Sequence, residues 1–290
     1  MNVGLIGVGA MGRPMALRLL SAGHEVGAYA RRPEALTPLV DAGATAHATP
    51  SALAGTCEVV VTMVTGTNDV EDVLLGPQGV AEGARPGTVA IDMSTISPAG
   101  TRRMAAALAG RGLHMLDAPV TGGVAGAGQG TLTIMVGGER PVLDRVRPVL
   151  DCLGTNIVHM GGHGAGQTAK ACNQLALLVN AEGVAEALAL ARRCGLDPSM
   201  VRRALLGGIA ASRVLDVFGA RMIDRQSDPL FPARLYHKDL HIVFDIANEA
   251  GQALPAASVV MKHIDTLMAR NQGGRDVSVL IELLEAGVEP

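Results

Sequence analysis

The chain has 290 residues, of which 48% are hydrophobic and 18% charged, and its formal net charge is −3. This length and composition predict a soluble globular protein with one large core or two smaller ones. Because the chain has no surplus of positive charge, the sequence argues against nucleic acid and against an anionic membrane surface as partners.

The N-terminus and the longest apolar stretch bear on location. The chain begins directly with the apolar strand pattern of residues 3–6 and shows no charged region or cleavage site of a secretory signal, so we expect a cytoplasmic protein. The apolar stretch from Leu175 to Ala191 is interrupted by Asn180, Glu182 and Glu186. These side chains are costly in lipid, and we predict a buried helix of a soluble protein, with no membrane span.

The cysteines and histidines do not predict a metal site. The four cysteines form no CxxC pair and have no zinc-type spacing with histidine, so we interpret them as reduced, mostly buried thiols. His237, His241 and Asp245 have a spacing that can ligate a metal. A single helix face without a further anchored ligand is more often a solvated face, and we expect no metal.

The first half of the chain, to about residue 162, alternates short apolar runs with amphipathic stretches, which predicts βαβ units on a doubly wound parallel sheet. The expected strands are Val3–Val8, Glu25–Ala30, Val59–Met63, Val89–Asp92, Met115–Asp117, Leu132–Val136 and Ile157–His159. The expected helices are Met11–Ser21, Pro33–Ala42, Pro98–Ala109 and Pro141–Cys152.

Beyond the glycine cluster at residues 161–164 the strand signals stop. Gln167–Arg193 is long enough for one helix of about 40 Å at 1.5 Å per residue. Further helices are expected at Pro198–Leu206, Lys238–Ala250, Ala256–Ala269 and Val277–Ala286. We therefore expect an all-helical C-terminal domain over residues 163–290, joined to the first domain by the long helix.

Residues 7–12 form a G-x-G-x-x-G sequence directly after a predicted strand and at the start of a predicted helix. The first glycine of this pattern permits a tight turn, the second lets the backbone reach a pyrophosphate, and the third allows close helix–strand contact. The sequence thus predicts a Rossmann-type dinucleotide-binding domain over residues 1–162. The expected contacts in this loop are Gly7, Gly9, Ala10, Met11 and Gly12.

The end of the second strand bears on cofactor choice. An NAD-selective fold usually has an acidic residue there, whereas this chain has Ala30, Arg31 and Arg32. Two guanidinium groups suit a 2′-phosphate, so we expect NADP(H) to be preferred, with NAD(H) possible. The alternative is that both arginines are solvated loop charges.

Three further motifs follow in order. They are Asp117-Ala118-Pro119-Val120-Thr121-Gly122-Gly123 with Gly130-Thr131-Leu132, then Gly164-Ala165-Gly166 leading to Lys170 and Asn173, and finally Lys238-Asp239-Leu240. With the glycine loop, and over residues 3 to about 284, the chain resembles the β-hydroxyacid dehydrogenase family, which includes 3-hydroxyisobutyrate dehydrogenase and tartronate semialdehyde reductase.

The resemblance implies a substrate loop at Thr121, Gly122 and Gly123, whose backbone N–H groups can cradle a carboxylate, although a glycine pair by default marks a simple turn. By the same resemblance, Lys238 and Asp239 begin a later helix and close the cleft. The remaining expected cofactor contacts are Met63, Val64, Ser94, Thr95, Lys238 and Asp239.

Lys170, Asn173 and Gln174 stand at i, i+3 and i+4 of the long helix and share one face. A lysine in this chain is notable because only three of its 24 basic Lys and Arg residues are lysine. The residues alone leave a snorkelling surface lysine as an equal alternative. The resemblance implies that Lys170 transfers the proton while hydride passes between the nicotinamide and the carbonyl carbon.

The resemblance also suggests a substrate. The pair Asn173-Gln174 resembles tartronate semialdehyde reductases, whereas 3-hydroxyisobutyrate dehydrogenases usually have two asparagines. We expect reduction of tartronate semialdehyde to glycerate, with Gln174 and Thr121 binding the substrate hydroxyl. The alternatives are 3-hydroxyisobutyrate, succinic semialdehyde and glyoxylate.

Two other classes of function share these features in part. Imine reductases have the same fold but replace the lysine, and a non-catalytic NADP-binding module predicts loss of the lysine or of the loop at residues 121–123. Both are present here. The family resemblance further implies a homodimer or homotetramer.

Overall fold

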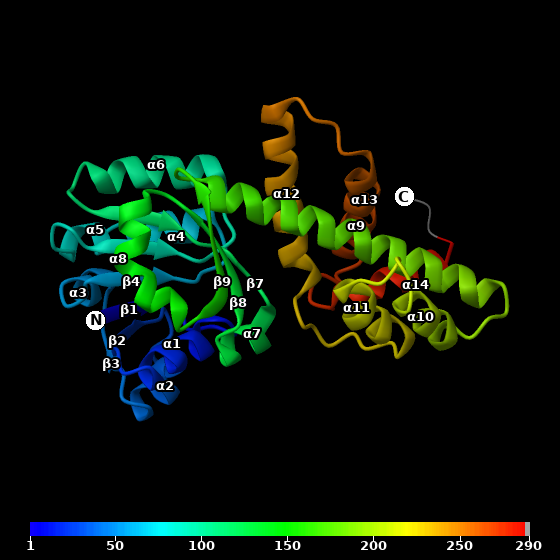
Figure 1. Ribbon diagram of the computed structural model, residues 1–290, viewed down its shortest axis with the longest axis horizontal. Helices are drawn as coiled ribbons and strands as arrows, with labels where there is room; N and C mark the ends of the chain where they lie inside the picture. Colours follow the sequence, from blue (N-terminus) through cyan, green and yellow to red (C-terminus); the bar gives the residue numbers. More distant parts are fainter. Residues whose placement is uncertain (288–290) are drawn as a thin grey trace. The chain divides into compact units, whose positions relative to one another are not determined.

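The computed structural model describes residues 1–287 and divides into two compact units, the first ending at Lys170 and the second beginning at Ala171. The last three residues of the expected helical domain therefore lie outside the described residues. One long helix, α9 (Ala165–Arg193), begins in the first unit and continues in the second, as the green ribbon in Figure 1 shows. This helix matches the long helix that the sequence predicts.

The first unit is built on one sheet, with strand order β3-β2-β1-β4-β5-β6-β8-β7 and with β9 paired to β8. Pairing is parallel from β3 to β6, antiparallel where β8 meets β6 and β7, and parallel again between β8 and β9. The strands are β1 (Asn2–Ile6), β2 (Glu25–Tyr29), β3 (Thr45–Ala46), β4 (Val59–Thr62), β5 (Val89–Asp92), β6 (His114–Asp117), β7 (Val120–Thr121), β8 (Leu132–Gly137) and β9 (Gly154–Gly161).

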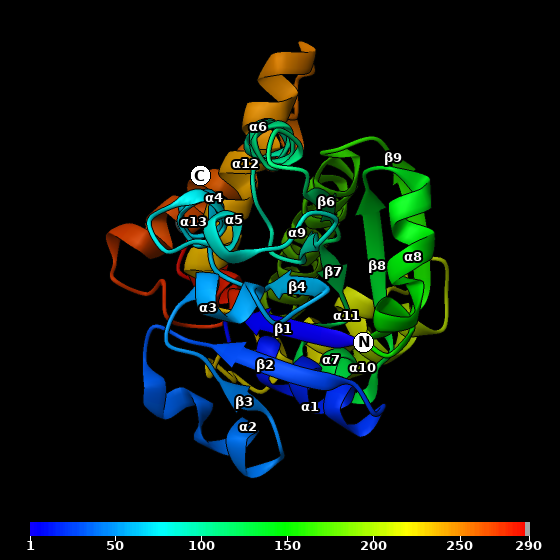
Figure 2. The same ribbon diagram turned by 90° about the vertical axis from the view of Figure 1, so that its left-hand side faces the viewer.

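Side chains of successive strand residues enter two different cores, because alternate residues of a strand point to opposite faces. In β1, Val3 and Leu5 join one core while Ile6 joins the other. The first core is covered by α1 (Gly12–Ser21), α2 (Thr37–Asp41) and α8 (Arg140–Asp151). The second is covered by α3 (Pro50–Ala54), α4 (Thr67–Leu75), α5 (Val80–Gly83) and α6 (Pro98–Ala109). Figure 2 shows α1 and α2 on one side of the strands and α4 to α6 on the other, which confirms the doubly wound fold.

The pairing register of the central strands aligns their carboxyl ends. Ile6 pairs with Thr62, Thr62 with Asp92, and Asp92 with Asp117. The loops that follow these four strands therefore start at the same edge of the sheet, which is where open α/β sheets bind ligands.

The second unit is helical, and its helices pack against the face of α9 that contributes buried side chains to the core of this unit. Its helices are α10 (Pro198–Leu206), α11 (Arg213–Ile223), α12 (Ala233–Ala250), α13 (Pro255–Ala269) and α14 (Leu280–Glu285). By length and composition α9 is apolar enough to cross a membrane. Leu178, Ala185 and Leu188 of α9 nevertheless belong to the core of this unit, as expected for the central helix of a helical domain.

Several elements differ from the sequence prediction. The helix expected at Lys238 begins five residues earlier, at Ala233, whose N–H donates to the carbonyl oxygen of Arg275 far along the chain. The segment expected as one helix at residues 33–42 is a 3₁₀ turn followed by α2. The helices α3, α4, α5, α7 (Gly123–Gln129) and α11 and the two-residue strands β3 and β7 were not predicted.

The cysteines also differ from the prediction that they are mostly buried. Only Cys57 is buried, Cys152 is half-buried, and Cys172 and Cys194 are exposed. Cys172 lies in α9 and Cys194 directly follows it. Other residues of α9 form the face that is buried in the core of the second unit.

Candidate active site

The glycine loop between β1 and α1 has the shape that a bound pyrophosphate needs. Gly7 has a φ of +95°, and a Cβ there would collide with the carbonyl oxygen of Met63. A Cβ on Gly12 would collide with the carbonyl oxygen of Gly7. Beside Gly9, by contrast, an added Cβ meets nothing within 4 Å. The loop is therefore closed tightly on its inner side and open at Gly9, and the helix that follows presents its N-terminus.

The two next loops along the sheet edge are joined by hydrogen bonds. The backbone N–H of Val64 donates to Ser94 Oγ at 2.9 Å, which connects the loops after β4 and β5. Thr62 Oγ1 and the Ser94 N–H donate to Asp92 Oδ1 at 2.7 and 3.2 Å. Four of the predicted cofactor contacts, Met63, Val64, Ser94 and Thr95, thus lie on two linked loops.

Asp92 is fully buried beneath these loops. Burial raises its pKa to about 7, and the nearby Asp117 adds to this effect, while the hydrogen bonds from Ser94 and Thr62 oppose it. Asp92 is not among the site residues predicted from the sequence. A signal was available, since Asp92 and Asp117 each end one of two neighbouring predicted strands.

The arginines expected to select NADP follow β2. Arg31 is exposed, with 78% of its side chain accessible, and its guanidinium lies 3.5 Å from Asp69 Oδ1. Asp69 belongs to the first turn of α4. Arg32 is exposed just before the 3₁₀ turn, and Ala30 is half-buried. An exposed guanidinium at this strand end fits a 2′-phosphate, which would then compete with the Asp69 carboxylate for Arg31.

The first turn of α9 is attached to the sheet edge by Asp117. Asp117 Oδ1 accepts from the Gly164 N–H at 2.8 Å, and Oδ2 accepts from the Gln167 N–H at 3.0 Å. Burial raises the pKa of Asp117, while these two backbone hydrogen bonds lower it. Lys170 lies one turn further along α9 and is 8% exposed, so it is not a snorkelling surface lysine.

The predicted substrate loop leads into a helix. Thr121 ends β7 and is half-buried, Gly122 precedes α7 as its N-cap, and Gly123 is the first residue of that helix. Both glycines are exposed. Their N–H groups belong to a helix start, which differs from the simple turn that a glycine pair indicates by default.

Four predicted residues of the second unit form a single polar row. Asn173 Nδ2 donates to Gln174 Oε1 at 2.9 Å, and Gln174 Nε2 donates to Asp239 Oδ2 at 2.6 Å. Lys238 Nζ lies 2.9 Å from Asp239 Oδ1. Lys238 and Asp239 lie within α12, so the prediction that they begin a helix is wrong. Gln174 and Asp239 are buried, whereas Asn173 and Lys238 are partly exposed.

The histidine face of α12 has other contacts. The rings of His237 and His241 are 4.6 Å apart, and His237 Nε2 lies 2.8 Å from Asp265 Oδ1. Within residues 1–287, no three or more His, Cys, Asp or Glu side chains are grouped as metal ligands would be.

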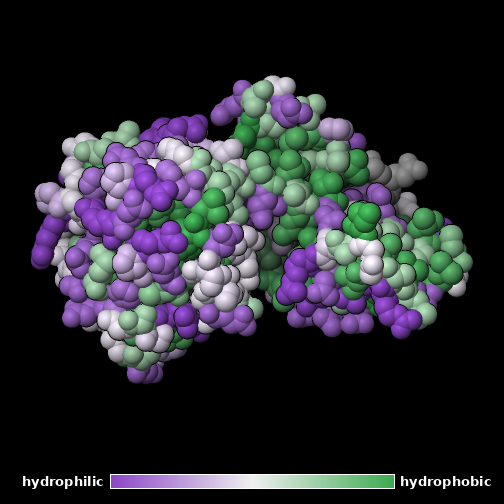
Figure 3. Space-filling model, in the orientation of Figure 1, coloured by the Kyte–Doolittle hydropathy of each residue, from purple (hydrophilic) through white to green (hydrophobic). Residues whose placement is uncertain are grey.

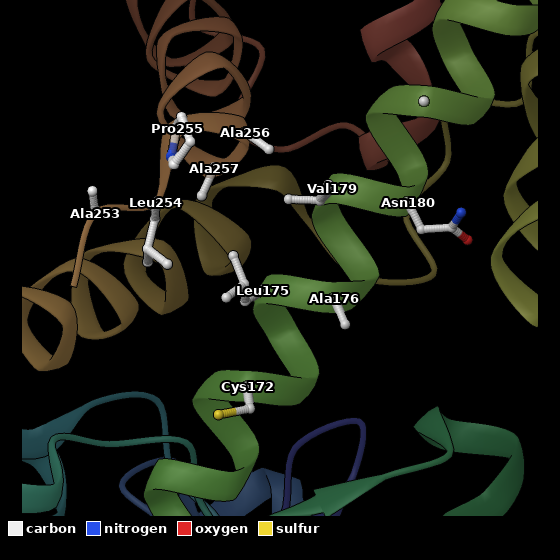
Figure 4. A pocket seen from close by; sticks show the side chains of 11 residues that line it. Cys172, Leu175, Ala176, Val179, Asn180, Ala253, Leu254, Pro255, Ala256 and Ala257 are labelled. Atoms are coloured by element: carbon white, nitrogen blue, oxygen red, sulfur yellow. The ribbon is translucent and has the colours of Figure 1, made fainter.

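A groove in the second unit is distinct from the predicted site residues. It runs along Cys172, Leu175, Ala176 and Val179 of α9, and residues 253–257 line its opposite side (Figure 4). Figure 3 shows that the visible surface around α12 and α13 is mostly hydrophobic. Asn180 is the only amide among the lining residues, so the groove offers little chemistry for hydride transfer.

Two family descriptions cover nearly the whole chain. Residues 2–162 match the NAD binding domain of 6-phosphogluconate dehydrogenase. Residues 164–284 match the NAD-binding domain of NADP-dependent 3-hydroxyisobutyrate dehydrogenase.

Individual proteins are similar over the same length. The chain is 41% identical to 2-hydroxy-3-oxopropionate reductase of Escherichia coli (strain K12), covering 98% of this chain and 97% of that protein. A crystal structure of 3-hydroxyisobutyrate dehydrogenase from Salmonella typhimurium is 32% identical, with a TM-score of 0.90 and coverage of 98% and 99%. The structure of Psf3 in complex with NADP⁺ and 2-OPP is 26% identical, with a TM-score of 0.88 and coverage of 97% and 99%.

The glycine loop, the aligned strand ends and the helical second unit agree with these similarities. The chain belongs to the β-hydroxyacid dehydrogenase family of NAD(P)-dependent oxidoreductases.

Proposed function

We propose that this protein reduces tartronate semialdehyde, also called 2-hydroxy-3-oxopropionate, to glycerate with NADPH. The observation that carries the substrate assignment is the polar row Asn173, Gln174, Asp239 and Lys238. A substrate with a hydroxyl on C2 needs polar partners, whereas one with a methyl group there needs an apolar wall. The similarity to the Escherichia coli 2-hydroxy-3-oxopropionate reductase supports the same substrate.

Asn173 and Gln174 have different parts in this proposal. Both ends of the Gln174 carboxamide are engaged, by Asn173 and by Asp239. We therefore assign contact with the hydroxyl to Asn173, which is partly exposed, and assign to Gln174 the task of orienting it. Direct contact of Gln174 or Thr121 with substrate stays a prediction.

Lys170 supplies the proton in the proposed reaction. When bound, the reduced nicotinamide supplies the hydride to the aldehyde carbon. The Lys170 ammonium donates a proton to the oxygen as negative charge develops there, and in the oxidation direction the neutral amine accepts it. The N–H groups at Gly122 and Gly123 hold the substrate carboxylate.

The test compares two aldehydes that differ only at C2. We expect kcat/KM for tartronate semialdehyde to exceed that for methylmalonate semialdehyde by about 10²-fold or more at saturating NADPH, because a methyl group on C2 offers no hydrogen-bond partner to the Asn173 amide. The variant Gln174→Asn tests the role of the polar row in this preference, because its shorter side-chain amide cannot reach both Asn173 and Asp239. We expect it to lower the preference mainly by slowing the hydroxyl-bearing substrate.

The runner-up is 3-hydroxyisobutyrate, which the similarity to the Salmonella typhimurium enzyme supports. Equal or faster reduction of methylmalonate semialdehyde by the wild-type protein would establish that substrate instead. Succinic semialdehyde and glyoxylate belong in the same panel.

We also propose a cytoplasmic homodimer or homotetramer. Exposed apolar side chains support association of the helical unit, among them Leu190, Leu196 and Met200. Light scattering coupled to size-exclusion chromatography measures the number of subunits.

A further inference from the structure

The carboxamide of Gln167 bridges the peptide groups on either side of Thr95. Its Oε1 accepts from the Ile96 N–H at 3.1 Å, and its Nε2 donates to the Ser94 carbonyl oxygen at 2.8 Å. The same Nε2 lies 3.4 Å from Asp92 Oδ2. Gln167 is 1% exposed, so these bonds form without competition from solvent. The Gln167 side chain of α9 therefore forms hydrogen bonds to the backbone of the loop after β5 on both sides of Thr95.

The backbone of Gln167 is fixed at the same time. Its own N–H donates to Asp117 Oδ2, and Asp117 Oδ1 accepts from Gly164. Gly166 lies so close to β8 that an added Cβ would collide with the carbonyl oxygen of Met135, and it would stand 2.9 Å from Asp117 Oδ2. The first turn of α9 therefore cannot slide along the sheet edge without breaking buried hydrogen bonds.

Lys170 is three residues beyond Gln167 and lies next to it on one face of the helix. The loop that Gln167 holds carries Ser94 and Thr95, the cofactor contacts expected after β5. Any shift of Gln167 relative to this loop changes the distance between the amine and the groups bound there.

We infer that Gln167 is a positioning residue that fixes the loop Ser94–Ile96 relative to the amine of Lys170. The inference rests on the proposed role of Lys170. Gln167 itself touches neither substrate nor cofactor in this scheme, and it acts through the loop and the helix turn. A primary amide suits this role because its oxygen accepts a hydrogen bond from the Ile96 N–H while its nitrogen donates one to the Ser94 carbonyl oxygen. Neither a carboxylate nor an apolar side chain can do both.

The first experiment compares Gln167→Met with Thr168→Val. Methionine keeps the length of the side chain but makes neither hydrogen bond to the loop. Thr168 lies on the same helix turn, and its Oγ1 donates only to the Gly164 carbonyl at 2.9 Å, so its valine variant loses one hydrogen bond without touching the loop. We expect Gln167→Met to lower kcat about 10²-fold, since small misplacement of a reacting group has effects of that size. KM and the NADPH dissociation constant should change less than about threefold, and Thr168→Val should keep the wild-type kcat.

The second experiment needs no turnover. The Ile96 N–H lies outside any helix or strand and donates to the Gln167 side chain, so its hydrogen exchange without cofactor reports on this bond. In the wild-type protein we expect Ile96 to be protected to a similar degree as Gly164 and Gln167. In Gln167→Met we expect Ile96 to exchange at least about tenfold faster, with strands β4 and β5 unchanged. A wild-type Ile96 amide that exchanges as fast as an open loop overturns the inference, even if the methionine variant does not fold.

Lys170→Ala separates this inference from the proposed function. If Lys170→Ala is inactive while Gln167→Met keeps the wild-type kcat, the positioning role is overturned and the role of Lys170 stands. If Lys170→Ala retains wild-type turnover, the proposed proton donor is wrong and the inference falls with it. Loss of kcat in both variants, with NADPH binding retained, supports both.

Discussion

At the scale of single residues, Lys170 has the clearest consequence for activity. It is buried one turn after the Asp117-anchored start of α9. We expect Lys170→Ala to lower kcat by about 10²–10⁴-fold, the usual effect of removing a positioned acid. NADPH affinity, measured by the change in nicotinamide fluorescence on binding, should change little because the glycine loop is formed by other residues.

The matched variant is Lys170→Arg. Arginine keeps the positive charge but does not release a proton near neutrality, so it should be nearly as slow as alanine. If arginine restored turnover, positive charge alone would explain the role of Lys170, and proton transfer would have to be assigned to another group.

Arg31 bears on cofactor choice. Its guanidinium is mostly exposed and lies near Asp69, so a 2′-phosphate can approach it from solvent. We expect Arg31→Ala to lower kcat/KM for NADPH by roughly one to two decades, in line with a charge-assisted hydrogen bond of about 1.5–3 kcal/mol. The value for NADH should stay the same. Arg32→Ala, measured beside it, shows whether the second arginine shares the contact, and an unchanged NADPH preference in both variants would exclude this strand end as its source.

At the scale of elements, the carboxyl ends of β4, β5 and β6 are aligned in the sheet. The carboxyl group of Asp92 is buried there, beneath the loops after β4 and β5 that carry predicted cofactor contacts. Burial raises the pKa of Asp92 to about 7, so the folded protein keeps a proton that the unfolded chain releases near pH 4. Below about pH 4, where Asp92 is protonated in both states, its ionisation does not lower the free energy of unfolding. Ionisation of Asp92 lowers this free energy progressively as the pH rises from about 4 to about 7, and the loss is constant above pH 7.

Asp92→Asn tests this dependence. We expect the free energy of unfolding of the variant, relative to wild type, to increase between pH 4 and pH 7 by a few kcal/mol and then to level off. Hydrogen bonds gained or lost by asparagine add an offset that is the same at every pH, so only the change with pH is diagnostic. Urea titrations at pH 4, 5, 6, 7 and 8 measure it, and parallel curves would show that folding does not raise the pKa of Asp92.

Local sequence signals predicted elements well where they were long or strongly patterned. The glycine loop, the main parallel strands and α9 all follow from periodicity and from glycine placement. Helix α7 did not, because its sequence, Gly-Val-Ala-Gly-Ala-Gly-Gln, has poor helix propensity. Its Gly126 packs against Leu132, a contact that only the folded chain provides. The start of α12 was missed because Ala233 is held by Arg275, far along the chain.

The candidate site shows the same limit. Lys170, Asn173 and the glycine loop were found because each belongs to a short pattern. The bond between Gln167 and Ile96 joins residues 71 positions apart, and that between Gln174 and Asp239 joins residues 65 apart. Spacing along the chain carries no information on such pairs, and only the register of the strands and the packing of the helices determines them.

At the scale of the whole molecule, the two units share one helix. The first turn of α9 is bound by Asp117, while Leu178, Ala185 and Leu188 of the same helix belong to the core of the second unit. Unfolding of either unit removes the packing partners from one part of this helix. We therefore expect the two units to unfold together although each has its own core.

Calorimetry with NADPH tests this coupling, because most of the predicted cofactor contacts, those of the glycine loop and of the loops after β2, β4 and β5, lie in the first unit, and only Lys238 and Asp239 lie in the second. At a free NADPH concentration about 100 times the dissociation constant, binding stabilises the folded state by about 2.7 kcal/mol. If the units unfold together, a single transition should move to higher temperature as a whole. Thr168→Val, which keeps both the loop contacts and the core, should show the same shift. Two transitions, of which only one moves with NADPH, would contradict the coupling and would show that α9 breaks near the division between the units.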